Sequence, residues 1–434
     1  GATGPTGPAG SAGSTGISLT ADGAITAGKA VTIEASTGKA KQVGAAADFT
    51  GSTQVPSYTT TQSGTRVEYN DYKERYLFLS ISGHVSAATR SGSTMTFGTS
   101  TQISGVDNYT GSGPGYIIID NTGGREFVIY PITNGSLVYR EVTGTGTTVT
   151  LGSETAILTR STNNSMKIGN GAKYIDFGSG DYLFTYSISG NTGVNLSQTF
   201  YYVAMNVPTS GSPTFSTPAL FPAAINDLDM RSSSDRGGMR LAKDSQDSTK
   251  GLLGYFYNNG SADRVAYAAL NFAGSGTSRT ISSVTGNANH PANYALNVGS
   301  ICATPGVGGS FVAAQKNGDL GTVRVILVSG GSLTFGNEVT SLSTSATGDT
   351  SADIISSSAN DNEVIILDMH PNYSTYSGSW SHFPAKQFLR VGTVSGNGIT
   401  VGTQTTLYTH IKGGASYEGN SASWSHYIVT EPGS

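Results

Sequence analysis

The sequence has little cysteine and little charge. Its 434 residues include a single cysteine, Cys302, which excludes an internal disulfide framework and stands in an apolar run that predicts a small buried side chain. Charged residues make up only 12 %, and the formal net charge of -4 leaves no basic surface for nucleic acid. No apolar run approaches the ~20 residues of a transmembrane helix, so we expect no membrane insertion.

Catalytic and metal-binding motifs are also missing from the sequence. It has no GxSxG elbow, HExxH, CxxC pair, Walker loop or EF-hand loop, and its six histidines are scattered. We therefore expect no enzyme activity and no cofactor. Loop Ca²⁺ stays possible but cannot be assigned, and solvated loop charge is the favoured interpretation of the acidic pairs. These pairs are Asp227 with Asp229, Asp244 with Asp247, and Asp361 with Glu363.

A short tripeptide recurs along the chain: Thr, an apolar residue, then Gly or Ser. Its copies begin at Thr96, Thr150, Thr214, Thr280, Thr334 and Thr400, at spacings of 54, 64, 66, 54 and 66 residues. Two apolar runs typical of β-strands precede each copy, and from the second copy onward a further short strand precedes those. Four strands per unit and about six units predict an all-β fold, a β-propeller of about six four-stranded blades.

The clearest unit contains the hairpin from Thr322 to Gly336. Val323, Val325 and Leu327 alternate with their neighbours as in a strand, and Gly330-Gly331 supplies the positive φ angles of a two-residue turn. We place the propeller at residues 65–434. The late strand HYIVT predicts closure of the ring by pairing of the two chain ends, and a seventh blade shared between the termini is the alternative.

The chain opens with a strict period of three glycines. Only glycine fits at the axis where three extended chains meet, so residues 1–16 predict a collagen-like triple-helical stalk that trimerises the chain. The glycines of this period are Gly1, Gly4, Gly7, Gly10, Gly13 and Gly16. A flexible linker is the alternative. Because the chain begins with glycine and shows no signal peptide, we expect a processed product or a missing upstream segment.

Residues 17–64 differ from both of these regions. Val31, Ile33, Ala40 and Val43 alternate with polar residues around glycine turns, which predicts a small β-unit with short hairpins. The polar stretch that follows reads as a linker into the propeller. The small unit has too few residues to bury much surface alone, and a trimer would let three copies share a core.

Both tryptophans stand in the same kind of pentapeptide, Ser-Trp-Ser-His followed by an aromatic residue. Tyr- and Gly-containing segments precede both copies, and rigid aromatic faces beside hydrogen-bonding groups suit a sugar ring. A structural turn, with each tryptophan packed on a neighbouring blade, is the alternative. The candidate ligand-binding residues are Tyr373, Tyr376, Trp380, Tyr417 and Trp424.

The GPTGPAG run, the TAGKAVTIEASTGKAKQV unit and blades ending in TVSGNGITVGTQTTL or VSGGSLTFGNEV together resemble tail fibre and receptor-binding proteins of bacteriophages. The resemblance implies a homotrimeric virion fibre whose distal domain contacts the host surface, and it transfers no functional residue. Bacterial surface and exosporium filament proteins use similar stalks, but usually end in a much shorter jelly-roll domain. Ser233-Ser234-Asp235-Arg236-Gly237 matches half of the Asp-box turn of sialidase-type propellers.

We therefore expect an adhesion protein on a virion tail fibre or another extracellular surface. Its expected partners are two further copies of itself, other virion or filament proteins, and a polysaccharide or glycan of the host. Linking three weak sites on one stalk raises apparent affinity by ~10² or more. A glycan-cleaving, sialidase-like enzyme and a purely structural decoration of a spore or surface filament are the alternatives.

Overall fold

The structure is a computed structural model. It describes residues 31–33, 40–42, 65–80, 82–91, 94–106, 115–160, 166–168, 173–189, 198–222, 239–258, 263–289, 295–317, 320–340, 351–357, 360–371 and 384–411. The chain divides into two compact units, residues 1–47 with 432–434, and residues 48–431. In the first unit β1 (Val31–Ile33) pairs antiparallel with β2 (Ala40–Gln42). The collagen-like glycines lie outside the described residues, so the stalk stays a prediction.

The described strands of residues 48–431 form six antiparallel sheets, each built from one continuous stretch of chain. The first sheet holds β3 (Thr65–Asn70), β4 (Arg75–Ser80), β5 (His84–Ser91), β6 (Thr94–Phe97) and β7 (Thr101–Gln102). The second holds β8 (Tyr116–Ile119), β9 (Glu126–Pro131), β10 (Leu137–Thr143), β11 (Thr150–Leu151) and β12 (Thr155–Leu158). The third holds β13 (Met166–Lys167), β14 (Ile175–Gly178), β15 (Asp181–Ser189), β16 (Gln198–Asn206), β17 (Thr214–Phe215) and β18 (Ala219–Leu220).

The other three sheets follow the same order of strands. The fourth holds β19 (Arg240–Lys243), β20 (Lys250–Asn258), β21 (Asp263–Ala273) and β22 (Thr280–Asn289), with the short helix η1 (Gly276–Ser278) between the last two. The fifth holds β23 (Ala295–Ala303), β24 (Ser310–Asn317), β25 (Leu320–Ser329) and β26 (Ser332–Phe335). The sixth holds β27 (Ser351–Ser356), β28 (Glu363–Pro371), β29 (Pro384–Ser395), β30 (Gly398–Val401) and β31 (Thr405–Ile411).

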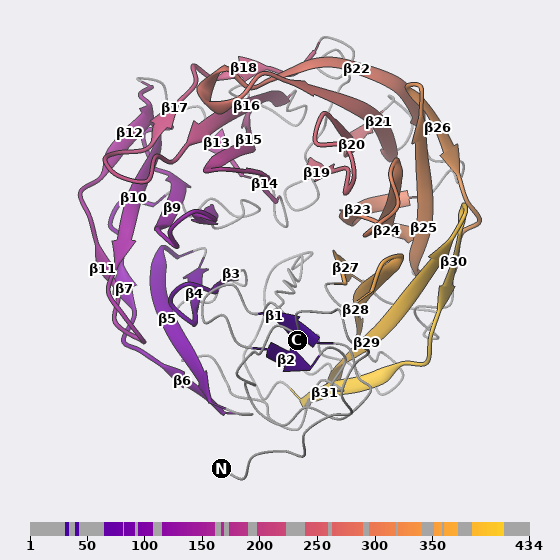
Figure 1. The fold of residues 1–434 in the computed structure, drawn as a ribbon, viewed down its shortest axis with the longest axis horizontal. Helices are drawn as coiled ribbons and strands as arrows, with labels where there is room; N and C mark the ends of the chain where they lie inside the picture. The colour runs from indigo at the N-terminus through magenta and orange to yellow at the C-terminus, as the bar shows by residue number, and fades with distance from the viewer. Residues whose placement is uncertain are drawn as a thin grey trace, which may run out of the picture. The chain divides into compact units, whose positions relative to one another are not determined.

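Figure 1 shows these sheets following one another around a ring, and the innermost strands of the later blades are β14, β19, β23 and β27. The predicted six-bladed propeller with four-stranded antiparallel blades is therefore confirmed. The extra strands β7, β12, β18 and β31 pair with the third strand of their sheets, as the fourth strands do. They continue an outer strand that bends after the recurrent tripeptide.

One detail of the predicted blades was wrong. The first copy of the repeat also has an innermost strand, β3, which pairs with β4 along its whole length. Its sequence is charged and polar, and Arg66 on it is buried against the ring of Tyr116 in the next sheet, 4.6 Å from the ring centre. The first and sixth sheets each come from one stretch of chain, and HYIVT lies outside the described residues.

The tripeptide lies on the outer strand of every blade, at the end of β6, β26 and β30 and at the start of β11, β17 and β22. Its last residue donates a backbone hydrogen bond to the third strand in five of the blades, as Gly98 does to Ala87 at 2.9 Å and Gly336 does to Val325 at 2.9 Å. A Cβ on Gly336 would lie 1.7 Å from the carbonyl oxygen of Asn397 in the sixth sheet, and one on Gly98 would lie 1.9 Å from that of Thr147 in the second. At these two positions the following blade approaches too closely for any side chain.

The hydrophobic core lies between blades. Five clusters of buried side chains each draw on two neighbouring sheets, from the first and second to the fifth and sixth. Strand β25 shows how alternation serves this arrangement, because Val323 and Val325 pack toward the sixth sheet while Ile326 packs toward the fourth. Cys302 is buried in the cluster between the fifth and sixth sheets, as predicted. The described residues contain no helix long and apolar enough to cross a membrane.

Several tyrosines are buried in these interfaces, and their burial predicts loss of stability at alkaline pH. Burial raises the pKa of Tyr130 to about 12 and raises the pKa of Tyr182, Tyr186 and Tyr267 as well. A folded-state pKa above the unfolded value of about 10 contributes stability that is complete below pH 10 and is lost as pH rises toward the folded value. We expect urea midpoints to be flat between about pH 7 and 9 and to fall steeply above about pH 10. A midpoint that stays constant to about pH 11.5 would contradict this expectation.

Candidate functional site

The aromatic residues proposed for ligand binding lie outside the described residues. Tyr373, Tyr376 and Trp380 belong to the connection between β28 and β29, and Tyr417 and Trp424 follow β31. The half Asp-box at Ser233–Gly237 and the pair Asp227 and Asp229 also lie outside. The structure therefore does not test whether these residues lie close together, and their roles stay predictions.

The backbone does fix where the connection of residues 372–383 begins and ends. Strands β28 and β29 pair without interruption from Glu363 opposite Thr393 to Pro371 opposite Ala385. The turn from β27 into β28 is at the Glu363 end of this hairpin, so the aromatic connection starts at the other end. Each blade has two ends. We call the end that carries the turn between its first and second strands, such as residues 71–74 and 121–125, the turn side. The opposite end, which carries the connection between the second and third strands, is the loop side.

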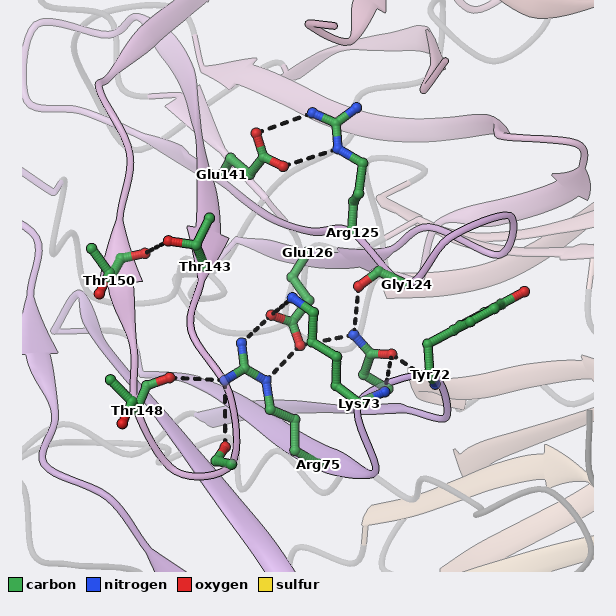
Figure 2. Close-up of polar contacts among 12 residues, drawn as sticks. Tyr72, Lys73, Arg75, Gly124, Arg125, Glu126, Glu141, Thr143, Thr148 and Thr150 are labelled. Atoms are coloured by element: carbon green, nitrogen blue, oxygen red, sulfur yellow. Dashed lines mark hydrogen bonds and ion pairs between the residues drawn. The ribbon is translucent and has the colours of Figure 1, made fainter. Parts of the chain in front are cut away.

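On the turn side, polar contacts join neighbouring blades, and the contact between the first and second blades includes a buried ion pair. Arg75 at the start of β4 forms an ion pair with Glu126 at the start of β9, and neither side chain has any exposed surface. Glu126 also accepts hydrogen bonds from Asn70 at 2.9 Å and Lys73 at 3.0 Å. Arg75 donates in addition to the carbonyl oxygen of Thr148, 2.8 Å away (Figure 2). Every oxygen of this buried carboxylate therefore has a donor.

The same side joins the later blades. Asn121 donates its side-chain amide to Asp176 of the third sheet at 2.6 Å, and its backbone N–H to the hydroxyl of Tyr182 at 2.8 Å. Asp181 of the third sheet accepts from the backbone N–H of Gly276 in the fourth at 2.7 Å. Asn362 of the sixth sheet donates its N–H to the carbonyl of Pro305 in the fifth at 2.8 Å. Hydrogen bonds at these turns therefore join neighbouring blades of the ring.

The carboxylates of the described acidic pairs accept hydrogen bonds within turns. Asp244 is buried, accepts from the backbone N–H groups of Gln246 and Asp247, and also accepts from Gly309 of the next blade. Asp247 accepts from Thr249, which lowers its pKa. Glu363 accepts from the amide of Asn360 at 2.6 Å. Among the residues that the structure describes, no group of three or more His, Cys, Asp and Glu could hold a metal ion.

A pocket of about 280 Å³ opens where the innermost strands of four blades come together. Its walls come from residues 173–176 beside β14, from β19, from β23 and from β27. Two lysines line it: Lys173, whose ammonium group donates to the carbonyl of Ile354 in the sixth sheet at 3.2 Å, and Lys243. The hydrogen bond from Lys173 to Ile354 joins the third sheet to the sixth, and these sheets are not neighbours in the ring. The pocket therefore lies in the central channel.

Lys243 is a partly buried cation of the pocket, and its pKa is lowered from its ordinary value. Burial lowers its pKa, the nearby Asp176 carboxylate raises it, and Arg279 lowers it further. Its ammonium group donates to the backbone carbonyl of Asp176 at 2.6 Å and lies 5.5 Å from the centre of the Phe177 ring. Arg279 lies on the same ring at 3.6 Å. Two cations thus share one aromatic ring beside the pocket.

This pocket was not predicted from the sequence. Lys173, Asp176 and Lys243 stand in different repeats, and nothing in their local pattern separates them from surface residues. A signal does exist once the repeat is aligned, because Lys243 ends the innermost strand directly before the turn. Lys243 lines the channel pocket from that place and reaches the backbone of Asp176 in the third sheet.

No family profile matches this sequence, and a comparison with curated proteins finds no match. Solved propellers are similar in structure. The Saccharomyces cerevisiae protein Sqt1 aligns at TM-score 0.39 and 9 % identity, covering 76 % of this chain and 94 % of Sqt1. The Dos1 propeller aligns at TM-score 0.39 and 11 % identity, covering 81 % of this chain and 86 % of that one. The strand order establishes the class: this chain contains a six-bladed β-propeller.

Proposed function

We propose that this chain is a non-catalytic adhesion protein whose propeller binds a glycan through its loop side. One observation carries the proposal. The aromatic connection of residues 372–383 begins and ends on a long, fully paired hairpin, at the end opposite the polar turns that join the blades. A ligand contact there leaves the interblade contacts untouched, and the hairpin gives the connection a rigid base.

The sequence supplies the chemistry for this proposal. Trp380 and Trp424 stand in matching pentapeptides with Tyr residues before them, and aromatic faces beside Ser, Asn and Gly suit the C–H face of a sugar. The glycine period of residues 1–16 supports a trimeric stalk, and three linked propellers would convert weak sugar contacts into firm attachment. A virion fibre or another extracellular filament is the setting that this combination favours.

The carboxylates that line the channel pocket help to distinguish glycan binding from glycan cleavage. Among the described residues that line its pocket, Asp176 is the single carboxylate, and its Oδ1 accepts from Asn121 and from the backbone of Gly178. Glycoside hydrolysis ordinarily needs a pair of carboxyl groups across the scissile bond. This arrangement supports binding without turnover, and incubation with host polysaccharide should release no reducing ends.

Replacing Trp380 or Trp424 with alanine should weaken attachment to host cells or to their isolated polysaccharide. An aromatic contact of about 0.5–1.5 kcal/mol corresponds to a loss of roughly 2- to 12-fold per site, and linkage of three chains multiplies it. Binding is measured by pull-down on cells and by surface plasmon resonance on immobilised polysaccharide. Tyr72→Ala is the control, because Tyr72 is an aromatic residue 50 % exposed on the turn side, and a urea midpoint checks that loss of its hydrogen bond to the Asn121 carbonyl leaves the propeller folded.

Unchanged binding in both tryptophan variants would overturn the aromatic site. Equal losses in the tryptophan variants and in Tyr72→Ala would show a general effect of removing surface aromatics and would overturn it too. The trimer has its own test, since the native mass of the intact chain should be three times that of one copy. A monomeric intact chain would contradict the stalk.

A further inference from the structure

The channel pocket is a second place where this protein can hold a ligand, and its chemistry differs from that of the aromatic connection. At about 280 Å³ it lies just below the ordinary range of small-molecule sites, which suits a ligand about the size of one sugar ring. Its walls are largely apolar, with Leu241, Ile301 and Ile355 among the lining residues, and its charged groups are few. Such a combination orients a small ligand through one polar group.

The charged group best placed to do this is Lys243. An ammonium group has three N–H donors, and the described acceptor of Lys243 is the neutral carbonyl oxygen of Asp176 at 2.6 Å. No carboxylate oxygen of the described residues lies within 4.0 Å of it as an ion-pair partner, unlike Lys73 with Glu126. A half-buried cation without a carboxylate partner is costly, and an incoming anion would offset that cost.

The surroundings add to the positive potential. Arg279 packs on the Phe177 ring that Lys243 also faces and acts on Lys243 electrostatically, and an ion pair with Asp181 at 3.5 Å offsets part of its charge. Lys173 lines the same pocket from the third sheet. Asp176 opposes these cations, but its Oδ1 is taken by the Asn121 amide and the Gly178 N–H, which fixes that carboxylate in the turn. The balance at the Lys243 ammonium group favours a small anion.

We propose that the channel pocket binds the carboxylate of a small organic acid, with Lys243 as the principal cation. Hydrogen bonds from an ammonium group to a carboxylate are about twice as strong as neutral ones, and the apolar walls strengthen them further by excluding water. The carboxylate can come from an acidic sugar or from a free organic acid. The proposal does not depend on the aromatic connection or on adhesion.

Isothermal titration with three probes tests the proposal on the full chain. D-glucuronate should bind saturably, whereas D-glucose, which has a similar ring and no carboxylate, should bind at least tenfold more weakly. Lactate separates the two sources: binding as tight as that of glucuronate assigns the site to small organic acids in general, and tighter binding of glucuronate assigns it to acidic sugars. Either result supports the carboxylate proposal. Equal binding of glucuronate and glucose, or no binding of either acid, would overturn it.

The variants are matched in charge. Lys243→Met should reduce glucuronate affinity at least tenfold, and Lys243→Arg should keep it within a few-fold. Lys250→Met is the control, because it removes the same charge from an exposed contact with Asn271 on the same blade. Circular dichroism and urea midpoints establish that each variant is folded. Wild-type affinity in Lys243→Met, or an equal loss in Lys250→Met, would overturn the assignment of Lys243.

Discussion

Glu126→Gln should destabilise the propeller by about 3–5 kcal/mol, the largest loss that we expect from a single polar replacement. The change removes a negative charge but almost no volume, so it leaves Arg75 buried with its positive charge uncompensated. Neither side chain of the pair has exposed surface, and the carboxylate also serves Asn70 and Lys73. The measurement is the free energy of unfolding from urea titration at neutral pH.

Glu141→Gln is the matched control for this experiment. Glu141 also pairs with an arginine, Arg125, at 2.9 Å in the same region of the molecule (Figure 2), but the two side chains are 36 % and 20 % exposed. Exposed ion pairs contribute about 0–1 kcal/mol, so the control should lie in that range. Similar losses for the two variants would show that burial of the Arg75–Glu126 pair does not determine its importance.

Gly336→Ala should destabilise the fold by about 1–3 kcal/mol or more, since the added methyl group meets the neighbouring blade. The new Cβ would lie 1.7 Å from the carbonyl oxygen of Asn397, and a backbone atom cannot swing aside as a flexible side chain can. The fifth and sixth sheets would have to separate at this point. Thermal and urea unfolding of the variant measure the loss.

The same tripeptide offers a control at Gly402. There the nearest atom to an added Cβ is the carbonyl oxygen of Val391 in the same sheet, at 3.2 Å. A shift of a few tenths of an ångström accommodates it, so Gly402→Ala should cost clearly less than Gly336→Ala. If the two variants lose equal stability, the glycine is required by the bend of the outer strand and not by the approach of the next blade.

Much of the blade could be predicted because its signals are local. In β25 and β26 the pairing ends at Ser329 opposite Ser332, and Gly330 and Gly331 have φ angles of 56° and 84°. A two-residue turn with positive φ at both positions is what Gly-Gly favours. Alternation and turn chemistry act over a few residues, so the sequence displays them directly.

The features that the sequence hid depend on contacts between blades. Arg75 and Glu126 are separated by 51 residues, and each alone looks like an ordinary surface charge at a strand end. Strand β3 escaped prediction for a related reason, because its Arg66 is buried against the ring of Tyr116 in the next sheet. Lys243 becomes notable only when four innermost strands surround it.

The interlocking turns have a consequence for how this protein can vary. The interblade hydrogen bonds of Arg75, Asn121 and Asn362 lie on the turn side, where loss of one buried charge, as in Glu126→Gln, is expected to be costly. A connection on the loop side, such as residues 372–383, only has to span two strand ends that are already paired. Doubling the length of a flexible loop costs only about 0.6 kcal/mol of closure entropy. The ring can therefore accept new loop lengths and sequences, and with them new ligands, while its frame stays the same.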